Sequence, residues 1–246
     1  MVAMFLSAGY LERFGYGGGE YVSLILFATV GMFVMASGAS LASLYVGLEL
    51  MALSVYVLVG YFKLEIKSNE GAVKYFVLGA ASSAILLYGI SLVYGSLGTL
   101  DLQTIRVSLA EVPTSNPMLV LGMVLVCFGM LFKVAAVPFH VWTPDAYEGA
   151  PTPVTAFISV APKAAAFAMF MRLFFDAFAA GIDHWRVVLW VASAATMIYG
   201  NIAALTQDNV KRMLAYSSIA HAGYALMGLV AFNQMGAWAL LMYMLV

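Results

Sequence analysis

Three ionisable residues lie well inside apolar stretches of the sequence, where a charged side chain is costly to hold. Glu49 lies in LASLYVGLELMALSVYVLVGY, Lys133 in VLGMVLVCFGMLFKVAAVPFH and Lys163 in VTAFISVAPKAAAFAMFMRLF. On insertion scales, each such charge in a membrane helix costs about 2.5–3.5 kcal/mol, so these residues need partners or water. Buried lysines and carboxylates of this kind mark proton relays and ion pathways, which makes proton movement the chemistry that they favour.

Pairing between these charges would lower the cost of burying them. The lowest-energy arrangement pairs Glu49 with one lysine and turns all three side chains toward the interior of a helix bundle. We take Lys133 as the partner, although spacing along the chain does not by itself decide between the two lysines. Changing the separation of a paired lysine and glutamate changes how firmly the lysine holds its proton, and a proton relay needs this property. A structural ion pair that only orients helices is the alternative interpretation.

The composition shows what kind of solvent surrounds these helices. Hydrophobic residues make up 64% of the chain and charged residues 9%, whereas soluble domains carry about 25% charged residues. A chain so poor in charge has too few polar side chains for a water-facing surface, so we expect an integral membrane protein. The net charge of −1 gives no case for nucleic acid as a partner, and the single cysteine, Cys127, cannot form an internal disulfide.

Apolar runs of about 20 residues, the length of a membrane span, recur along the chain. They predict helices at about 21–38, 41–62, 71–94, 117–137, 154–175, 185–206 and 213–232, with an eighth from about 236. We therefore expect an all-α polytopic membrane protein of about seven to eight transmembrane helices. A loop with Asp101, Arg106 and Pro113 should separate the third helix from the fourth. The eighth helix is cut off at Val246 in mid-span, so we expect the chain to be part of a longer protein.

Prolines stand close to both buried lysines. Pro138 follows Lys133 by five residues within PFHVWTPDAYEGAPTP, and Pro162 directly precedes Lys163. Counted at about 1.5 Å per residue, Lys163 lies roughly 14 Å and Glu49 roughly 12 Å into their helices, near mid-membrane. Broken helices at this depth are tolerated beside protein or water-filled cavities, and their ends favour ion sites. We therefore expect helix breaks at Pro138 and Pro162, with packing kinks as the alternative.

Other polar residues give weaker signals. Lys74, His140 and His221 are further candidates for a proton relay, because a membrane histidine can exchange protons at neutral pH. The alternatives are that the histidines only hydrogen-bond a neighbouring helix and that Lys74 extends to the membrane surface. Asp145 and Glu148 are expected to solvate the loop that carries them.

Redox and metal chemistry find no support in the sequence. It has no cysteine cluster for iron–sulfur, no histidines paired at haem spacing and no glycine-rich nucleotide loop in a βαβ context. We therefore expect no catalytic redox centre, metal or cofactor in this chain.

Several long blocks resemble the antiporter-like membrane subunits of respiratory complex I, an NADH:quinone oxidoreductase, and most closely the subunit N group, the homologues of mitochondrial subunit 2. The blocks are VGLELMALSVYVLVGY, KYFVLGAASSAILLYGISLVYGSLGT, FKVAAVPFHVWTPDAYEGAPTPVTAFISVAPKAAAFAMFMRLF and GNIAALTQDNVKRMLAYSSIAHAGYALMGLVA. The resemblance covers nearly the whole chain beyond about Tyr21, with the blocks in the family's order.

The resemblance implies a fold of two inverted five-helix repeats, each with one broken helix. Residues 21–176 would form one complete antiporter-like repeat and 177–246 part of the second, after an N-terminal loop or remnant of an upstream region at 1–20. The resemblance also implies that Glu49 pairs with Lys133, that Lys163 lies on the central axis, and that Lys74 occupies a further family position.

The function that the resemblance implies is proton translocation, coupled to quinone reduction elsewhere in the complex. NADH, FMN, iron–sulfur clusters and quinone would be bound by other subunits. The expected partners are the lipid bilayer and the other membrane subunits of complex I, including neighbouring antiporter-like subunits. The expected location is the bacterial inner (cell) membrane, as a multi-pass protein, with an organelle inner membrane as the second option. Two alternatives stay open: a subunit of a multi-subunit sodium/proton antiporter, and a structural membrane subunit that does not pump.

Overall fold

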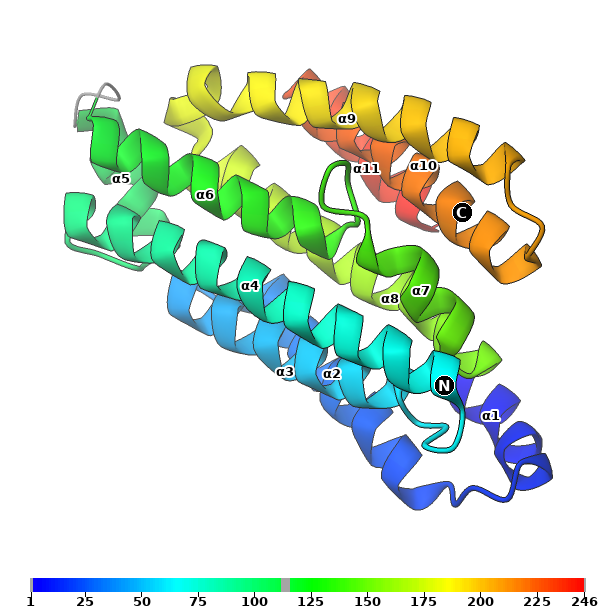
Figure 1. The fold of residues 1–246 in the computed structure, drawn as a ribbon. Helices are drawn as coiled ribbons and strands as arrows, with labels where there is room; N and C mark the ends of the chain where they lie inside the picture. Colours follow the sequence, from blue (N-terminus) through cyan, green and yellow to red (C-terminus); the bar gives the residue numbers. More distant parts are fainter. Residues whose placement is uncertain (1, 112–115, 246) are drawn as a thin grey trace.

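The computed structural model describes residues 2–111 and 116–245, which form helices joined by short turns and irregular segments (Figure 1). Their bounds are α1 Val2–Arg13, α2 Gly19–Ser37, α3 Leu41–Val59, α4 Ile66–Leu97, α5 Leu102–Glu111, α6 Pro117–Lys133, α7 Trp142–Gly149, α8 Thr152–Met171, α9 Ile182–Leu205, α10 Val210–Ala231 and α11 Gln234–Leu245. A π-helical turn and a short 3₁₀ turn connect α8 to α9. Val246, where we expect the last helix to be cut off, lies outside the described residues.

Within the described residues, six helical segments are long and apolar enough to cross a membrane, and two shorter apolar helices, α6 and α11, accompany them. The six segments are Gly19–Ser37, Leu41–Val59, Ile66–Leu97, Thr152–Ala177, Ala179–Leu205 and Val210–Ala231. The prediction of an all-α polytopic membrane protein with about seven to eight spans is therefore confirmed.

Side chains just outside the helices explain where several of them begin. Ser40 and Ser43 form a reciprocal capping box at the start of α3, which satisfies backbone amides that have no partner within the helix. Asn116 caps α6, and Pro117 occupies the first helical position, where the missing amide hydrogen costs nothing. The side chain of Asn209 accepts hydrogen bonds from the backbone amides of Lys211 and Arg212, and so caps α10.

Two segments interpreted as loops are helical. The loop interpretation of residues 1–20 is wrong for α1, and that of the segment after the third span is wrong for α5. In α5, Leu102, Ile105 and Leu109 are buried at the spacing of one helix face, and Asp101 accepts a hydrogen bond from the amide of Thr104 at 2.8 Å. A short amphipathic helix of this kind lies below the length of a membrane span. Pro113, the other end of that predicted loop, lies outside the described residues.

Apart from the short helices α1 and α5, the helices fall into three groups that lie side by side (Figure 1). α2 packs on α3, and α4 joins them on one side of the molecule. α9, α10 and α11 form the opposite side. α6, α7 and α8 lie between these groups: α6 contacts α4 and α9, and α7 contacts α4 and α10. The central group is therefore positioned to bring charged residues of both sides together.

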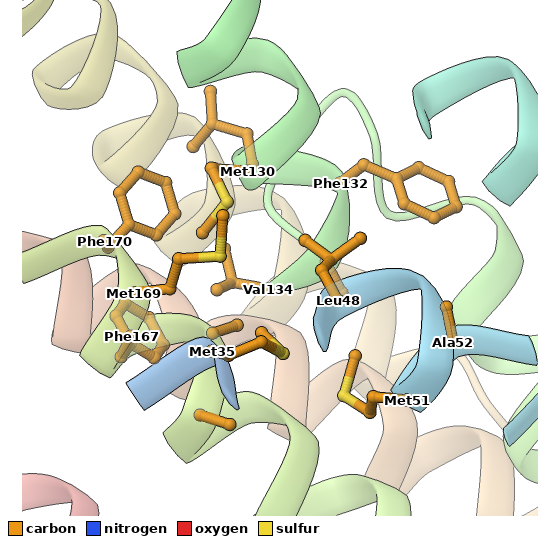
Figure 2. Packing of buried hydrophobic residues seen from close by; sticks show 14 of the residues in the cluster. Met35, Leu48, Met51, Ala52, Met130, Phe132, Val134, Phe167, Met169 and Phe170 are labelled. Carbon is orange, nitrogen blue, oxygen red and sulfur yellow. The ribbon is translucent and has the colours of Figure 1, made fainter. Parts of the chain in front are cut away.

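The core of the bundle is an apolar cluster to which several helices contribute. Figure 2 shows Met35 of α2, Leu48 of α3, Met130 of α6 and Phe167 of α8 meeting in it, and all of them are buried. Glycines set the spacing where α4 crosses α6. A Cβ atom on Gly89 would lie 2.8 Å from the amide nitrogen of Val126, so only glycine allows this approach.

Candidate functional site

α6 ends at Lys133, and regular helix resumes at Trp142 in α7, so the predicted break around Pro138 is present. The intervening backbone is held from outside: the amide of Val137 donates a hydrogen bond to Oγ1 of Thr196 on α9 at 2.9 Å. The sequence predicted that PFHVWTPDAYEGAPTP would be irregular along its whole length. This is wrong for its middle part, where α7 forms. The indole of Trp142 stacks on Tyr75 of α4, with ring centroids 4.0 Å apart, and this packing anchors the short helix.

The second predicted break is wrong. Pro162 lies inside α8, which is continuous from Thr152 to Met171. A proline has no amide hydrogen, so the helix loses one hydrogen bond at this point, to the carbonyl of Ile158. Membrane helices tolerate such a loss when neighbouring helices pack around them, and α8 contacts α2, α3, α6, α10 and α11. Of the two buried lysines, only Lys133 therefore adjoins a helix break.

Glu49 and Lys133 are brought together at the end of α6. The Lys133 ammonium lies 3.9 Å from Oε1 of Glu49, and their side chains are 2% and 24% exposed. The hydroxyl of Ser83 on α4 lies between them: Lys133 donates to Ser83 Oγ at 3.4 Å, and Ser83 donates to Glu49 Oε1. The site therefore joins three helices, α3, α4 and α6, through one carboxylate, one hydroxyl and one ammonium group.

Small residues on α4 let these three helices approach one another. Gly79 faces the phenol of Tyr56 on α3 so closely that a Cβ atom would have no room. On the same turn, Ser82 donates a hydrogen bond to the carbonyl of Gly129 on α6 at 3.4 Å. These contacts fix the position of α4 between α3 and α6. In this position, the side chain of Ser83 reaches both Glu49 and Lys133.

Lys163 is buried on α8, but no hydrogen bond or ion pair in the described part of the chain joins it to Glu49 or Lys133. Its ammonium group donates to the backbone carbonyl of Ser218 at 2.8 Å and to the Ser218 hydroxyl at 2.6 Å. It also lies 6.0 Å from the centroid of the Tyr147 ring, within cation–π range. The lysine thus bridges α8 to α10 and faces α7, with neutral partners on all of these sides.

A cavity of about 760 Å³ adjoins Lys163 between α8, α10 and α11. His221 lines it, with Nδ1 in a hydrogen bond to the hydroxyl of Tyr243 on α11. Lys211 lines it as well, at the start of α10. The cavity therefore places His221 beside the same open space as Lys163, while Glu49 and Lys133 do not line it.

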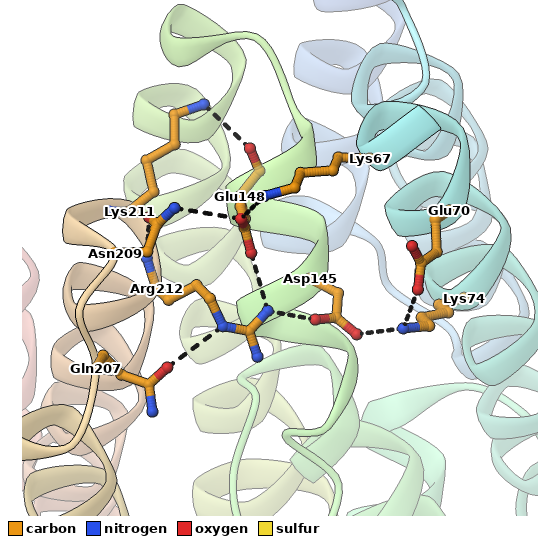
Figure 3. Close-up of polar contacts among 9 residues, drawn as sticks. All are labelled: Lys67, Glu70, Lys74, Asp145, Glu148, Gln207, Asn209, Lys211 and Arg212. Carbon is orange, nitrogen blue, oxygen red and sulfur yellow. Dashed lines mark hydrogen bonds and ion pairs between the residues drawn. The ribbon is translucent and has the colours of Figure 1, made fainter. Parts of the chain in front are cut away.

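His140 and Lys74 lie apart from the buried charges. His140 is buried in the break, next to the ring of Tyr199 at 4.6 Å between centroids, and its Nδ1 has no hydrogen-bond partner within the described residues. Lys74 forms ion pairs with Glu70 at 2.6 Å and Asp145 at 2.8 Å, in a partly exposed position. Lys74 therefore belongs to a charged cluster near the start of α4, which Figure 3 shows.

This charged cluster ties α7 to both of its neighbours. It comprises Lys67, Glu70 and Lys74 of α4, Asp145 and Glu148 of α7, and Gln207, Asn209, Lys211 and Arg212 at the turn between α9 and α10 (Figure 3). Asp145 and Glu148, expected only to solvate a loop, each pair with cations from both sides.

The cluster shifts the pKa values of both carboxyl groups in α7, which lies outside the candidate spans. Burial raises the pKa of Asp145, but hydrogen bonds from Lys74 and Arg212 outweigh this effect and leave the pKa lowered. The hydrogen bond from Lys67 lowers the pKa of Glu148, and Arg212 adds to the effect. Both groups therefore stay ionised through the neutral range.

The sequence did not identify three residues that contact the buried lysines or belong to the charged cluster: Ser83, Tyr147 and Arg212. A serine inside an apolar helix carries no signal of its own, and GAASSA reads as a packing surface. Arg212 stands in a polar turn, where arginine is common. Spacing along one chain does not reveal that Asp145 lies opposite Arg212, because the contact joins residues 67 positions apart.

The comparisons with known proteins agree with this geometry. The family described as "NADH:quinone oxidoreductase/Mrp antiporter, TM" matches residues 38–246. A relative from Trichlorobacter lovleyi named NADH-quinone oxidoreductase subunit N is 51% identical over 99% of this chain, which covers 50% of that protein. The chain thus spans about half the length of the curated relatives it matches.

Two solved structures share the fold. A chain of respiratory complex I from Thermus thermophilus with bound aureothin has a TM-score of 0.81 at 37% identity, over 99% of this chain and 52% of its own. A chain of the Mrp complex from Dietzia sp. has a TM-score of 0.81 at 27% identity, over 90% and 41%. With its candidate spans and its bacterial relatives, the chain is a multi-pass protein of the bacterial inner membrane. The family match, the fold and the helix that is broken next to a buried lysine together show that this chain belongs to the transmembrane family of NADH:quinone oxidoreductase and Mrp antiporter subunits.

Proposed function

We propose that the full-length protein is a proton-translocating membrane subunit of an NADH:quinone oxidoreductase. The observation that carries the proposal is the pair of the partly buried Glu49 and the buried Lys133, 3.9 Å apart beside a helix break. A lysine held close to a carboxylate keeps its proton, and one that moves away from it releases the proton more readily. A small movement at the end of α6 would therefore change the proton occupancy of Lys133.

In this proposal the chain itself carries no electrons. NADH, FMN, iron–sulfur clusters and quinone belong to other subunits, and quinone reduction there drives the movement here. The partners are the other membrane subunits of complex I, among them neighbouring antiporter-like subunits. The relatives named as subunit N support this assignment.

The proposal assigns the proton route to Glu49, Lys133 and Lys163, with His140, His221 and Lys74 as further relay candidates. Residues 21–176, which contain α3 to α8 and all but the first two residues of α2, form the first antiporter-like repeat, and 177–246 belong to the second. The segment 1–20 precedes both and includes α1. The cavity between Lys163 and His221 supports their place on one route.

Replacing Lys133 by alanine in the full-length protein within its assembled complex tests the function. Acid–base groups contribute about 10²–10⁴-fold to proton transfer, so we expect NADH-driven proton pumping into inside-out vesicles to fall by about tenfold or more. NADH oxidation with an artificial electron acceptor, which reports assembly of the peripheral subunits, should stay at the wild-type rate. Undiminished pumping would contradict the proposal and leave a structural role.

A sodium/proton antiporter subunit is the second candidate, because the Mrp complex chain shares the fold at a TM-score of 0.81. Purification of the tagged full-length protein separates the two candidates. We expect NADH-oxidising subunits to co-purify with it. Vesicles that acidify in response to a sodium gradient, with no NADH oxidation in the purified complex, would favour the antiporter.

A further inference from the structure

Ser83 differs from most other hydroxyl residues in the helices of this protein. Ser54 and Ser96, like several others, donate their hydrogen to the carbonyl four residues earlier in their own helix. This is the usual partner for a serine within a helix. Ser83 instead directs its hydroxyl across to Glu49 on α3 and accepts from Lys133 on α6. Its neighbour Ser82 binds a backbone carbonyl of α6, so two adjacent serines of similar burial have different roles.

The direct path from Lys133 to Glu49 is longer than either step through Ser83. Proton transfer takes place at about 2.6–3.2 Å, and hydrogen bonds that are longer at rest tighten to this range in the reacting state. The ammonium nitrogen lies 3.9 Å from the carboxylate oxygen but 3.4 Å from Ser83 Oγ, which is already hydrogen-bonded to Glu49. Ser83 is the side chain in the described part of the chain that hydrogen-bonds to both.

The lysine end of this path is closed to solvent. The side chain of Lys133 is 2% exposed, whereas that of Glu49 is 24% exposed. Ser83 itself is 5% exposed. Burial strengthens the attraction between the charges, and a proton that leaves a buried ammonium group needs a hydrogen-bonded neighbour to receive it. A hydroxyl both donates and accepts, so it is suited to this position.

We propose that the hydroxyl of Ser83 carries the proton between Lys133 and Glu49. The ammonium nitrogen gives up a proton to Ser83 Oγ as the hydrogen already on Oγ passes to Glu49 Oε1. One N–H bond and one O–H bond break, and two O–H bonds form. Lysine and glutamate end neutral, and the serine ends as a hydroxyl whose hydrogen now points toward Lys133. Rotation about the Cβ–Oγ bond then restores the starting arrangement. This inference rests on the proposed function, because it describes one step of the same proton route.

The test compares Ser83→Thr with Ser83→Val in the full-length protein within its complex. Threonine and valine have nearly the same shape, and only threonine has the hydroxyl. We expect Ser83→Thr to pump protons at close to the wild-type rate per NADH oxidised. Ser83→Val should lose about tenfold or more, because a proton-transfer group contributes about 10²–10⁴-fold. Electron transfer to an artificial acceptor and the amount of complex in the membrane verify that each variant assembles.

Ser83→Ala repeats the comparison with a smaller side chain in case Ser83→Val does not assemble, and it should lose pumping as well. Ser54→Ala is the matched control and should pump normally, since Ser54 is as buried as Ser83 but donates its hydrogen to the carbonyl of Leu50 in its own helix. If Ser83→Ala or Ser83→Val pumps like Ser83→Thr, the hydroxyl is not required and the inference fails. It also fails if Ser83→Thr and Ser83→Val lose pumping equally.

The same experiments keep this inference apart from the proposed function. Normal pumping in Ser83→Ala together with lost pumping in Lys133→Ala would overturn the role of Ser83 alone. Normal pumping in both variants would overturn the proposed function, and with it this inference.

Discussion

Arg212 at the start of α10 forms an ion pair with Asp145 of α7, with 2.5 Å between Nη1 and Oδ1. The other oxygen of the same carboxylate pairs with Lys74 of α4 at 2.8 Å. α7 is separated from α6 by the break, so these charges replace the support that a continuous helix would give. The two sides of the bundle therefore meet on one carboxylate in the short helix that follows the break.

Acid should weaken this connection in a defined range. The pKa values of Asp145 and Glu148 are lowered in the folded protein, so the folded state favours their ionised forms. Their contribution to stability is therefore complete above the ordinary carboxyl range, about pH 4, and is lost as the pH falls through the lowered values. We expect the thermal unfolding temperature of the full-length protein in detergent to fall below about pH 4. In the variant Asp145→Asn/Glu148→Gln, the unfolding temperature should fall less over the same pH range.

The double variant should also be less stable at pH 7, by about 1–2 kcal/mol, since partly exposed ion pairs contribute about 0.2–1 kcal/mol each. Glu70→Gln is the control, because Glu70 is 55% exposed and, among the residues that the structure describes, pairs only with Lys74. An acid transition of equal size in the double variant and the wild type would show that other carboxylates determine it.

Thr196 should hold the break in place. Its hydroxyl accepts the hydrogen bond from the amide of Val137 at 2.9 Å. Thr196→Val keeps the shape but leaves that amide without a partner, which costs about 1–3 kcal/mol. Thr196→Ser keeps the hydroxyl and should retain most of the stability. Hydrogen exchange followed by mass spectrometry gives a local measurement: the peptide that covers residues 134–141 should exchange faster in Thr196→Val. Equal exchange in the two variants would contradict this role.

Gly89→Ala should separate α4 from α6. A Cβ atom at this position would lie 2.8 Å from the amide nitrogen of Val126 and 2.9 Å from the carbonyl oxygen of Gly122. Overpacking of this kind costs about 1–3 kcal/mol, and we expect the unfolding temperature to drop accordingly.

Gly95→Ala is the matched control in the same helix, since its nearest atom, in the Met118 side chain, lies 3.4 Å away. Alanine favours helix by about 1 kcal/mol over glycine, so this variant should be as stable as the wild type or more so. If both variants lowered the unfolding temperature equally, the close approach of α4 and α6 at Gly89 would not explain the loss of stability.

Physical reasoning on the sequence predicted the long helices and a lysine partner for Glu49, and the family resemblance implied that this partner is Lys133. Apolar runs long enough to span a membrane leave few alternatives to helix, and a buried carboxylate needs a buried cation. Lys133 was chosen from two lysines, and the structure places it next to Glu49.

Contacts between distant segments could not be predicted in the same way. The bridge by Ser83 depends on which face α4 turns toward α3, and α4 is apolar on more than one side. Pro162 was misjudged because the effect of a proline depends on how closely neighbouring helices surround it. α5 and α7 were missed because helices of ten and eight residues do not show the long apolar runs on which the prediction relied.

The ammonium group of Lys163 rests partly on the main chain, at the carbonyl oxygen of Ser218. In an α-helix this oxygen also receives the amide hydrogen four residues later, from Ala222. Mutation of the side chain at position 218 therefore removes one support of the cation and leaves the other intact. Loss of the proton from Lys163 would weaken its hydrogen bond to that oxygen. The charge state of a side chain on α8 is therefore linked to a backbone carbonyl of α10.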